Sequence, residues 1–177
     1  PGEGPKAPKR RAGARAGPKG PAPYTGPVRV KICGITRLED ALLAEALGAF
    51  ALGFVLAPGS RRRIAPEAAR AIGEALGPFV VRVGVFRDQP PEEVLRLMEE
   101  ARLQVAQLHG EEPPEWAEAV GRFYPVIKAF PLEGPARPEW ADYPAQALLL
   151  DGKRPGSGEA YPRAWAKPLL ATGRRAI

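Results

Sequence analysis

The sequence alternates between short apolar runs and longer amphipathic runs, and this alternation is what most restricts the fold. Six apolar runs recur at intervals of roughly 20–25 residues, and a segment with helical patterning follows each of them. The runs at 79–86 (FVVRVGVF) and 147–151 (ALLLD) are apolar at nearly every position, which is typical of strands buried on both faces of a parallel sheet. The sequence therefore predicts an α/β fold built on parallel strands.

Turn and capping residues set the expected limits of the elements. Strands are expected at 28–33, 50–55, 79–86, 105–109, 124–130 and 147–151, with the first residues of a seventh strand at 175–177. Helices are expected from the first turn after 36 to about 47 and at 66–76, 92–101 and 114–120, with shorter ones near 140 and at 161–165. Pro66, Pro91 and Pro114 suit first helical turns. Thr36 and Glu39 have the spacing of a capping box that begins the first helix.

A parallel sheet of this kind is either open and doubly wound or closed into a barrel. No GxGxxG or GxxxxGK[ST] loop follows an expected strand, which argues against an open nucleotide-binding sheet. Polar residues instead lie at or near the C-terminal ends of four strands: Cys33, His109, Lys128 and Asp151. Barrels hold their catalytic groups at these strand ends. We therefore predict a parallel (β/α)8 barrel of the TIM-barrel class, of which this chain covers about six strand–helix units and the start of strand seven.

The basic charge of the chain is concentrated before residue 28. Residues 1–27 contain six Lys or Arg and one Glu, a net charge of +5, so residues 28–177 carry only +1 of the total +6. A segment so rich in Pro, Gly and basic residues cannot bury enough apolar surface to fold, and we expect 1–27 to be a disordered extension and 28–177 a partial-barrel domain. Nucleic-acid binding by the folded part is not expected. An arm at 1–27 that binds nucleic acid is an alternative, and its binding would weaken steeply with salt.

Cysteine usage and hydropathy restrict the setting of the protein. Cys33 is the only cysteine, so no internal disulfide can form, and a reducing, cytoplasmic compartment is expected. Because Cys and His occur once each, they cannot build a Cys/His zinc cluster. No apolar run approaches the ~18 residues of a membrane span. We expect no metal site of this kind and no membrane association.

Cys33 and Asp151 are the strand-end residues that fit acid–base chemistry. A thiol at a barrel mouth acts as a base when cationic groups stabilise its thiolate, and Lys31 lies two residues earlier on the same strand face. A carboxyl at the edge of an apolar core is expected to have a raised pKa, which suits Asp151 to the role of general acid. Both residues also fit structural roles, as a small buried side chain and as a loop cap.

Three further features fit substrate binding. The arginines at 61–63 follow the second strand and can hold an anion through paired hydrogen bonds, although a solvated charge run is the alternative. His109 can polarise a substrate or bond to the barrel rim. The loop Gly156–Gly158 after the sixth strand can bind an anion through its amides.

Several segments occur together in a fixed order. They are VKICGIT at 30–36, GFVLAPGSRR at 53–62, RVGVF at 82–86, VAQLHGEE at 105–112, VIKAF at 126–130 and LLLDGKRPGSGEAY at 148–161. In this order and approximate spacing they resemble the phosphoribosylanthranilate isomerase family over residues 28–177, and KICGIT and QLHGEE are the most specific of them. The resemblance implies an Amadori rearrangement of tryptophan biosynthesis without cofactor or metal. In this reaction N-(5-phosphoribosyl)anthranilate becomes 1-(o-carboxyphenylamino)-1-deoxyribulose 5-phosphate.

The resemblance also implies roles for single residues. Cys33 would be the general base and Asp151 the general acid. Arg62 is expected to bind the substrate near its anthranilate end, and Gln107 and His109 to line the pocket. We add two neighbours of the base to the expected substrate-binding set, Lys31 and Gly34.

The sequence departs from the family pattern in ways that keep a second hypothesis open. Pro155 stands where the family's anion loop has its first glycine, the leader at 1–27 has no counterpart, and the sequence ends where strand seven begins. Loops after strands seven and eight commonly hold phosphate in barrels. The alternative is a catalytically inactive, truncated barrel that binds a phosphosugar or acts as an interaction module. A monomer and a homodimer both fit the sequence.

Overall fold

The computed structural model describes residues 28–152 and 161–177, so the expected disordered extension and the Gly156–Gly158 loop lie outside the described residues. The strands are β1 (Lys31–Cys33), β2 (Ala51–Val55), β3 (Val81–Phe86), β4 (Val105–Leu108), β5 (Val126–Leu132) and β6 (Ala147–Gly152). The α-helices are α1 (Leu38–Ala46), α2 (Pro66–Glu74), α3 (Pro91–Glu100), α4 (Pro114–Gly121) and α5 (Lys167–Leu170). Two 3-10 helices, η1 (Pro138–Asp142) and η2 (Arg163–Ala166), complete the order.

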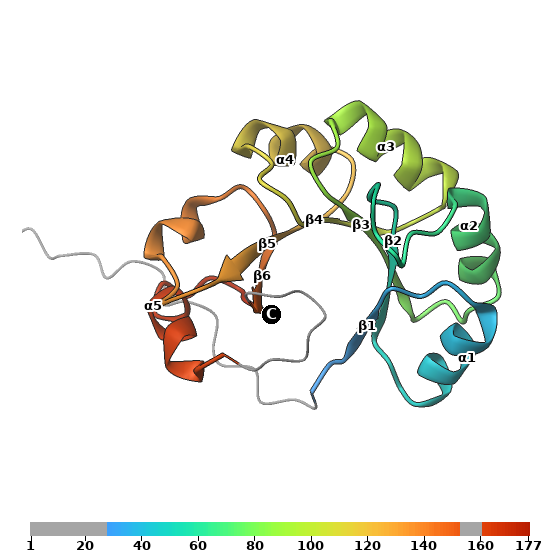
Figure 1. Cartoon of the computed structure of the whole chain (residues 1–177), viewed down its shortest axis with the longest axis horizontal. Helices are drawn as coiled ribbons and strands as arrows, with labels where there is room; N and C mark the ends of the chain where they lie inside the picture. Colours follow the sequence, from blue (N-terminus) through green and yellow to red (C-terminus); the bar gives the residue numbers. More distant parts are fainter. Residues whose placement is uncertain (1–27, 153–160) are drawn as a thin grey trace, which may run out of the picture.

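The strands form one parallel sheet in the order β1-β2-β3-β4-β5-β6, which is also their order along the chain. The sheet curls into an arc, with α1 to α4 along its convex outer side (Figure 1). Ala176 forms a parallel bridge with Leu148, and the Ile177 amide donates to the Leu148 carbonyl at 2.7 Å. The last residues thus lie along the outer edge of β6, where the seventh strand was expected. The predicted α/β fold is confirmed as a curled half-barrel of the (β/α)8 type.

Proline begins three of the outer helices, as predicted. Each of α2, α3 and α4 has Pro in its first turn. The predicted capping box of α1 is wrong, because the N-cap is Arg37 and its third helical residue is Asp40 rather than Glu39. The Arg37 side chain instead bonds Asp40 at 2.8 and 3.0 Å across the first turn.

Alternation along the strands divides the buried side chains between two faces of the sheet. Phe54, Phe86 and Leu108 are fully buried and belong to a large cluster between the sheet and the outer helices. Each such side chain contributes about 1.5–3 kcal/mol relative to exposure. Val55, Val85 and their neighbour Cys33 belong to a separate small cluster. The neighbouring positions of these strands therefore face the inside of the arc.

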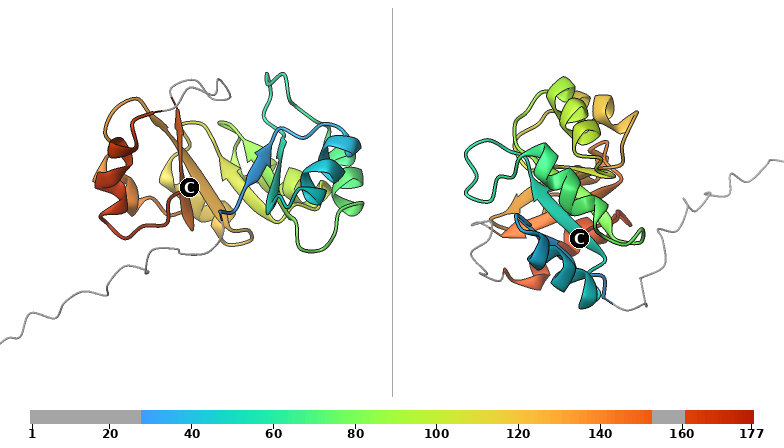
Figure 2. Two further views of the ribbon diagram at one scale, coloured as in Figure 1. Left: turned by 90° about the horizontal axis from the view of Figure 1, so that it is seen from below. Right: turned by 90° about the vertical axis from the view of Figure 1, so that its right-hand side faces the viewer.

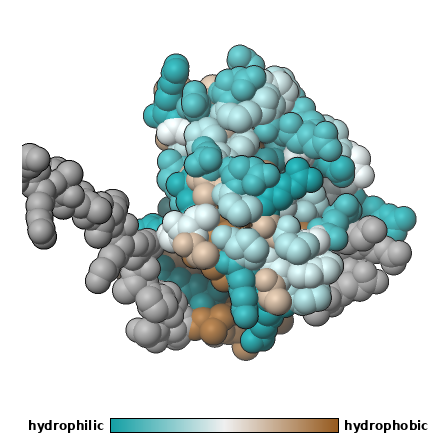
Figure 3. All heavy atoms as spheres, turned by 90° about the vertical axis from the view of Figure 1, so that its left-hand side faces the viewer, coloured by the Kyte–Doolittle hydropathy of each residue, from teal (hydrophilic) through white to brown (hydrophobic). Residues whose placement is uncertain are grey.

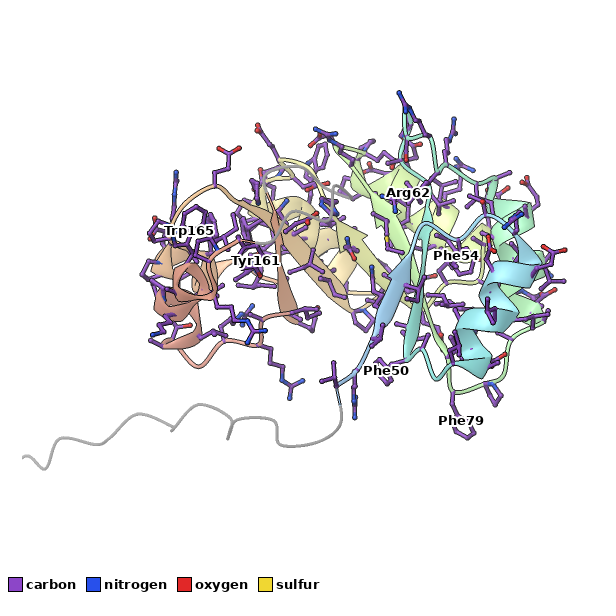
Figure 4. All side chains as sticks on the ribbon, turned by 60° about the horizontal axis from the view of Figure 1, so that its bottom comes forward. Phe50, Phe54, Arg62, Phe79, Tyr161 and Trp165 are labelled. Atoms are coloured by element: carbon purple, nitrogen blue, oxygen red, sulfur yellow. The ribbon has the colours of Figure 1, made fainter. Side chains whose placement is uncertain are left out.

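The two ends of the strands carry different side chains. In the left view of Figure 2 the strands lie between α5 at one side and α1 and α2 at the other. Figure 4 shows Arg62 at one end of the strands and the exposed Phe50 and Phe79 at the opposite end.

The outer face on the α5 side is mostly hydrophilic, with a small group of hydrophobic atoms near one edge (Figure 3). Within the described residues, no helix has the length and apolar composition needed to cross a membrane.

Candidate active site

Cys33, Gly34 and Arg62 meet at the carboxyl end of β1. The Arg62 guanidinium donates to the Cys33 carbonyl at 3.0 Å, although the two residues are 29 positions apart. Gly34 has φ +90°, and a Cβ built there would lie 2.6 Å from Arg62 Cδ. Gly34 therefore allows both a left-handed backbone and the close approach of Arg62. The structure brings these three predicted residues together.

Gly53 lets the thiol of Cys33 sit against the neighbouring strand. Cys33 pairs with Gly53 in the register of β1 and β2. A Cβ on Gly53 would lie 2.9 Å from Cys33 Sγ, 3.2 Å from its Cα and 3.3 Å from Lys31 Nζ. The glycine thus makes room for the thiol and for the ammonium beside it. We did not predict this role, although a glycine inside a strand can signal close approach of other atoms.

The second group of predicted residues is a hydrogen-bonded chain from β4 to β6. Gln107 Nε2 lies 2.8 Å from His109 Nδ1, and His109 Nε2 lies 3.1 Å from Asp151 Oδ2. The backbone amide of Gly152 donates to the other carboxylate oxygen at 2.8 Å. Gln107 is 1% exposed, whereas the side chains of His109 and Asp151 are 25% and 28% exposed. The hydrogen-bonded series therefore runs from the buried Gln107 to the partly exposed carboxylate of Asp151.

The expected raised pKa of Asp151 is wrong. The hydrogen bond from His109 is the main cause that holds the pKa of this carboxyl below its usual range, and the His109 charge, the Gly152 amide and the Lys31 charge act in the same direction. Burial acts in the opposite direction but is outweighed. Lys31 is near Cys33 in β1 and also acts on Asp151 in β6, so it connects the two groups of predicted residues.

Lys128 does not join these groups, although it was one of the four polar strand-end residues. It pairs with Leu108 in the register of β4 and β5, on the face that packs against the outer helices. Its ammonium bonds Glu112 at 2.7 Å, and both side chains are almost completely buried. A buried ion pair of this kind is structural.

A cavity of about 590 Å³ is lined by other residues than these two groups. Lys128, Phe130, Trp140 and Tyr143 line it together with the loops after β4 and β5. Phe130 and Trp140 stack with their ring centroids 4.6 Å apart. Burial and the negative charges of Glu112 and Glu115 raise the pKa of Tyr143. The cavity contains none of the predicted site residues.

No three His, Cys, Asp or Glu side chains of the described residues gather in a way that could hold a metal ion. What the geometry offers is a thiol and a carboxyl on the inner face, with a lysine near both. An arginine and an imidazole stand beside them, as predicted. These are the groups of an acid–base site for an anionic substrate.

The family model described as N-(5'phosphoribosyl)anthranilate (PRA) isomerase matches residues 30–167, a range that contains both groups of residues. The chain belongs to this family. It is 45% identical over 149 residues to the curated N-(5'-phosphoribosyl)anthranilate isomerase of Deinococcus radiodurans, which covers 80% of this chain and 69% of the relative.

Solved structures of the family agree with the arc of strands and helices. The crystal structure of phosphoribosyl anthranilate isomerase from Thermus thermophilus is 99% identical, with a TM-score of 0.83 over 85% of this chain and 75% of that one. A structure of the isomerase in complex with reduced 1-(o-carboxyphenylamino)-1-deoxyribulose 5-phosphate is 45% identical, with a TM-score of 0.66 over 71% of this chain and 65% of that one. The chain thus spans about two thirds to three quarters of these family members.

Proposed function

We propose that the protein isomerises N-(5-phosphoribosyl)anthranilate to 1-(o-carboxyphenylamino)-1-deoxyribulose 5-phosphate, a step of tryptophan biosynthesis. The observation that carries the proposal is the placement of Cys33 and Asp151. They lie at the carboxyl ends of β1 and β6, the two edge strands of the arc, and Lys31 lies near both. An acid and a base on opposite sides of a small substrate are what an aldose–ketose rearrangement requires.

The first step needs the acid. The Asp151 carboxyl gives its proton to the furanose ring oxygen, the bond from that oxygen to C1 breaks, and the nitrogen lone pair forms a C=N bond. Asp151 reaches such a substrate because its side chain is partly exposed, whereas the leucines beside it in β6 turn partly or fully into the core. Placing the charged nitrogen near a carboxylate also stabilises the product of this step.

The second step needs the base. The Cys33 thiolate removes the proton from C2, and the resulting enolamine tautomerises to the ketone. The Lys31 ammonium and the thiol both lie against Gly53 of the neighbouring strand, so a cation stands on the side of the base. Acid and base each supply about 10²–10⁴-fold in such reactions.

Substrate binding is proposed for the remaining residues of the site. Arg62 is held over the end of β1 and has further N–H groups for the anthranilate carboxylate. Gly34 keeps Arg62 in this place. His109 lines the pocket on the side of the acid, and the buried Gln107 stands behind it.

The proposed setting follows from the free thiol and from the family. Cys33 is a free, partly exposed cysteine, and a reducing compartment such as the cytoplasm keeps a thiol base active. A solved family member from Thermotoga maritima is described as dimeric, and we propose a phosphosugar and a second copy of the chain as partners.

Turnover of the purified chain and of two variants tests this function. Freshly generated N-(5-phosphoribosyl)anthranilate is supplied and the loss of anthranilate fluorescence is followed. Cys33→Ala and Asp151→Asn are expected to keep the circular dichroism spectrum and to lose at least about 10²-fold in kcat. Near-normal turnover in either variant refutes its assigned role. A folded wild-type chain without turnover supports the alternative of a non-catalytic phosphosugar-binding barrel.

A further inference from the structure

The orientation of the Gln107 amide indicates one tautomer of the sole histidine. The amide nitrogen of Gln107 faces His109 Nδ1 at 2.8 Å. An amide nitrogen can only donate, so with the amide in this orientation Nδ1 is the acceptor and carries no proton. The proton of the neutral ring is then on Nε2, which donates to Asp151 Oδ2 at 3.1 Å.

This arrangement suits a carboxylate rather than a carboxylic acid. The ring donates to Asp151, and the same hydrogen bond holds the pKa of the carboxyl low. The charged group of β1 that acts on Asp151, Lys31, works in the same direction. A general acid has to carry a proton when the substrate arrives. With a neutral His109 ring and an ionised Asp151, the pair holds only the Nε2 proton, so it must take up a second proton before it can act.

Gln107 has the means to accommodate that proton. Its other amide atom, Oε1, is buried and has no hydrogen-bond partner within the described residues. Turning the amide by half a turn about its last side-chain bond would place Oε1 against Nδ1. The oxygen could then accept a hydrogen bond from a protonated Nδ1, and the amide nitrogen would take the unpartnered place.

We propose that Gln107 and His109 hold the proton that Asp151 delivers, with Gln107 acting as a positioning residue whose amide follows the protonation of the ring. This inference rests on the proposed function, in which Asp151 is the acid. In the unloaded pair the amide nitrogen of Gln107 donates to Nδ1, and Asp151 is ionised. A proton from water loads the pair, Oε1 accepts from Nδ1–H, and the second proton lies between Nε2 and Oδ2.

The proton then moves in a balanced sequence. It passes from Nε2 to Oδ2 and on to the furanose ring oxygen, whose bond to C1 breaks with the electron pair staying on oxygen. The pair is left as a neutral ring with Nδ1–H and an Asp151 carboxylate. A proton from water at Nε2 loads it again. His109 thus supplies the proton that a carboxyl with a lowered pKa does not hold by itself.

Nitrogen NMR of the ring tests the proposal without any substrate. His109 is the only histidine of the chain, so every imidazole signal of an untagged, ¹⁵N-labelled sample belongs to it. At alkaline pH the wild-type chain is expected to show a single tautomer with the proton on Nε2. Gln107→Glu, which presents an acceptor only, is expected to move the proton to Nδ1. Gln107→Leu is expected to give the averaged shifts of an unrestrained ring.

Gln89→Leu is the matched control. Gln89 is 4% exposed, also has a buried unpartnered Oε1, and bonds Glu93 of α3 rather than the histidine. Its loss is expected to lower stability and to leave the His109 signals unchanged. Averaged shifts in the wild-type chain, or an Nε2 proton that persists in Gln107→Glu, overturn the proposal.

Kinetics separates positioning from substrate binding. Gln107→Leu is expected to lower kcat about tenfold or more with KM within twofold of the wild-type value, because the lost contact supports the acid and not the substrate. A raised KM with unchanged kcat overturns the proposal in favour of direct substrate binding by Gln107. A wild-type chain without turnover refutes the proposed function, while the ring tautomers still decide whether this hydrogen-bonded chain exists.

Discussion

Gly53→Ala is expected to displace the Cys33 thiol and so to lower both stability and turnover. The new Cβ would lie 2.9 Å from Cys33 Sγ and 3.2 Å from its Cα. Non-bonded heavy atoms prefer separations of about 3.5–4.0 Å, so the thiol has to retreat by roughly 0.6–1.1 Å. Overpacking of this size costs about 1–3 kcal/mol of stability. A displacement near 1 Å of a reacting group costs about 10²-fold in rate.

Two measurements separate these effects. Urea unfolding gives the loss of stability, and turnover at saturating substrate gives kcat while the variant is still folded. Gly134→Ala is the control, because a Cβ there meets no atom within 4 Å and φ at Gly134 is not positive. It is expected to change neither quantity appreciably. If Gly53→Ala keeps wild-type kcat and stability, the thiol does not occupy the position that β1 and β2 give it, and the reasoning fails.

Three further predictions concern stability and binding. Lys128→Met leaves the buried Glu112 carboxylate without its ion-pair partner and is expected to lower the free energy of unfolding in urea by about 3–5 kcal/mol. Arg96→Met breaks an exposed ion pair on α3 and should lower it by less than about 1 kcal/mol. Equal costs would contradict a structural role for the pair of Lys128 and Glu112. Gly34 and Gly48 both have a positive φ, but only a Cβ at Gly34 would come within 2.6 Å of Arg62. Gly34→Ala should therefore raise KM, whereas Gly48→Ala should not. An equal rise in KM for both variants would refute the steric reason. Asp151 has a lowered pKa in the folded state, so its contribution to stability is present above the unfolded value near 3.9 and is lost as pH falls through the folded value. The stability difference between wild type and Asp151→Asn, measured in urea at a series of pH values, should therefore shrink below about pH 4, and a difference that grows there would contradict the lowered pKa.

The fold was predictable because its signals are local. Short apolar or alternating runs predicted every strand, and first-turn prolines predicted the starts of α2, α3 and α4. Strand starts were placed too early where an apolar residue precedes the paired segment. Phe79, for example, was assigned to a strand but is 91% exposed, and β3 begins at Val81. An apolar side chain does not by itself report whether its backbone is paired.

The site was predictable in composition but not in geometry. Lys128 and Asp151 both follow apolar strands, yet the strand register turns Lys128 toward the outer helices and Asp151 toward the inside of the arc. One residue of shift exchanges the two faces of a strand, and sequence alone does not give that register. His109 and Asp151 bond across 42 residues, so the partner that lowers the carboxyl pKa could not be foreseen.

Alkylation of the single thiol tests whether Cys33 is the base at the substrate site. Because Cys33 is the only cysteine, iodoacetamide gives one adduct that mass spectrometry can count. Turnover is expected to fall in proportion to this adduct. Reduced 1-(o-carboxyphenylamino)-1-deoxyribulose 5-phosphate is expected to slow the modification. A fully alkylated chain that keeps its turnover, or modification that the ligand does not slow, would contradict this role of Cys33.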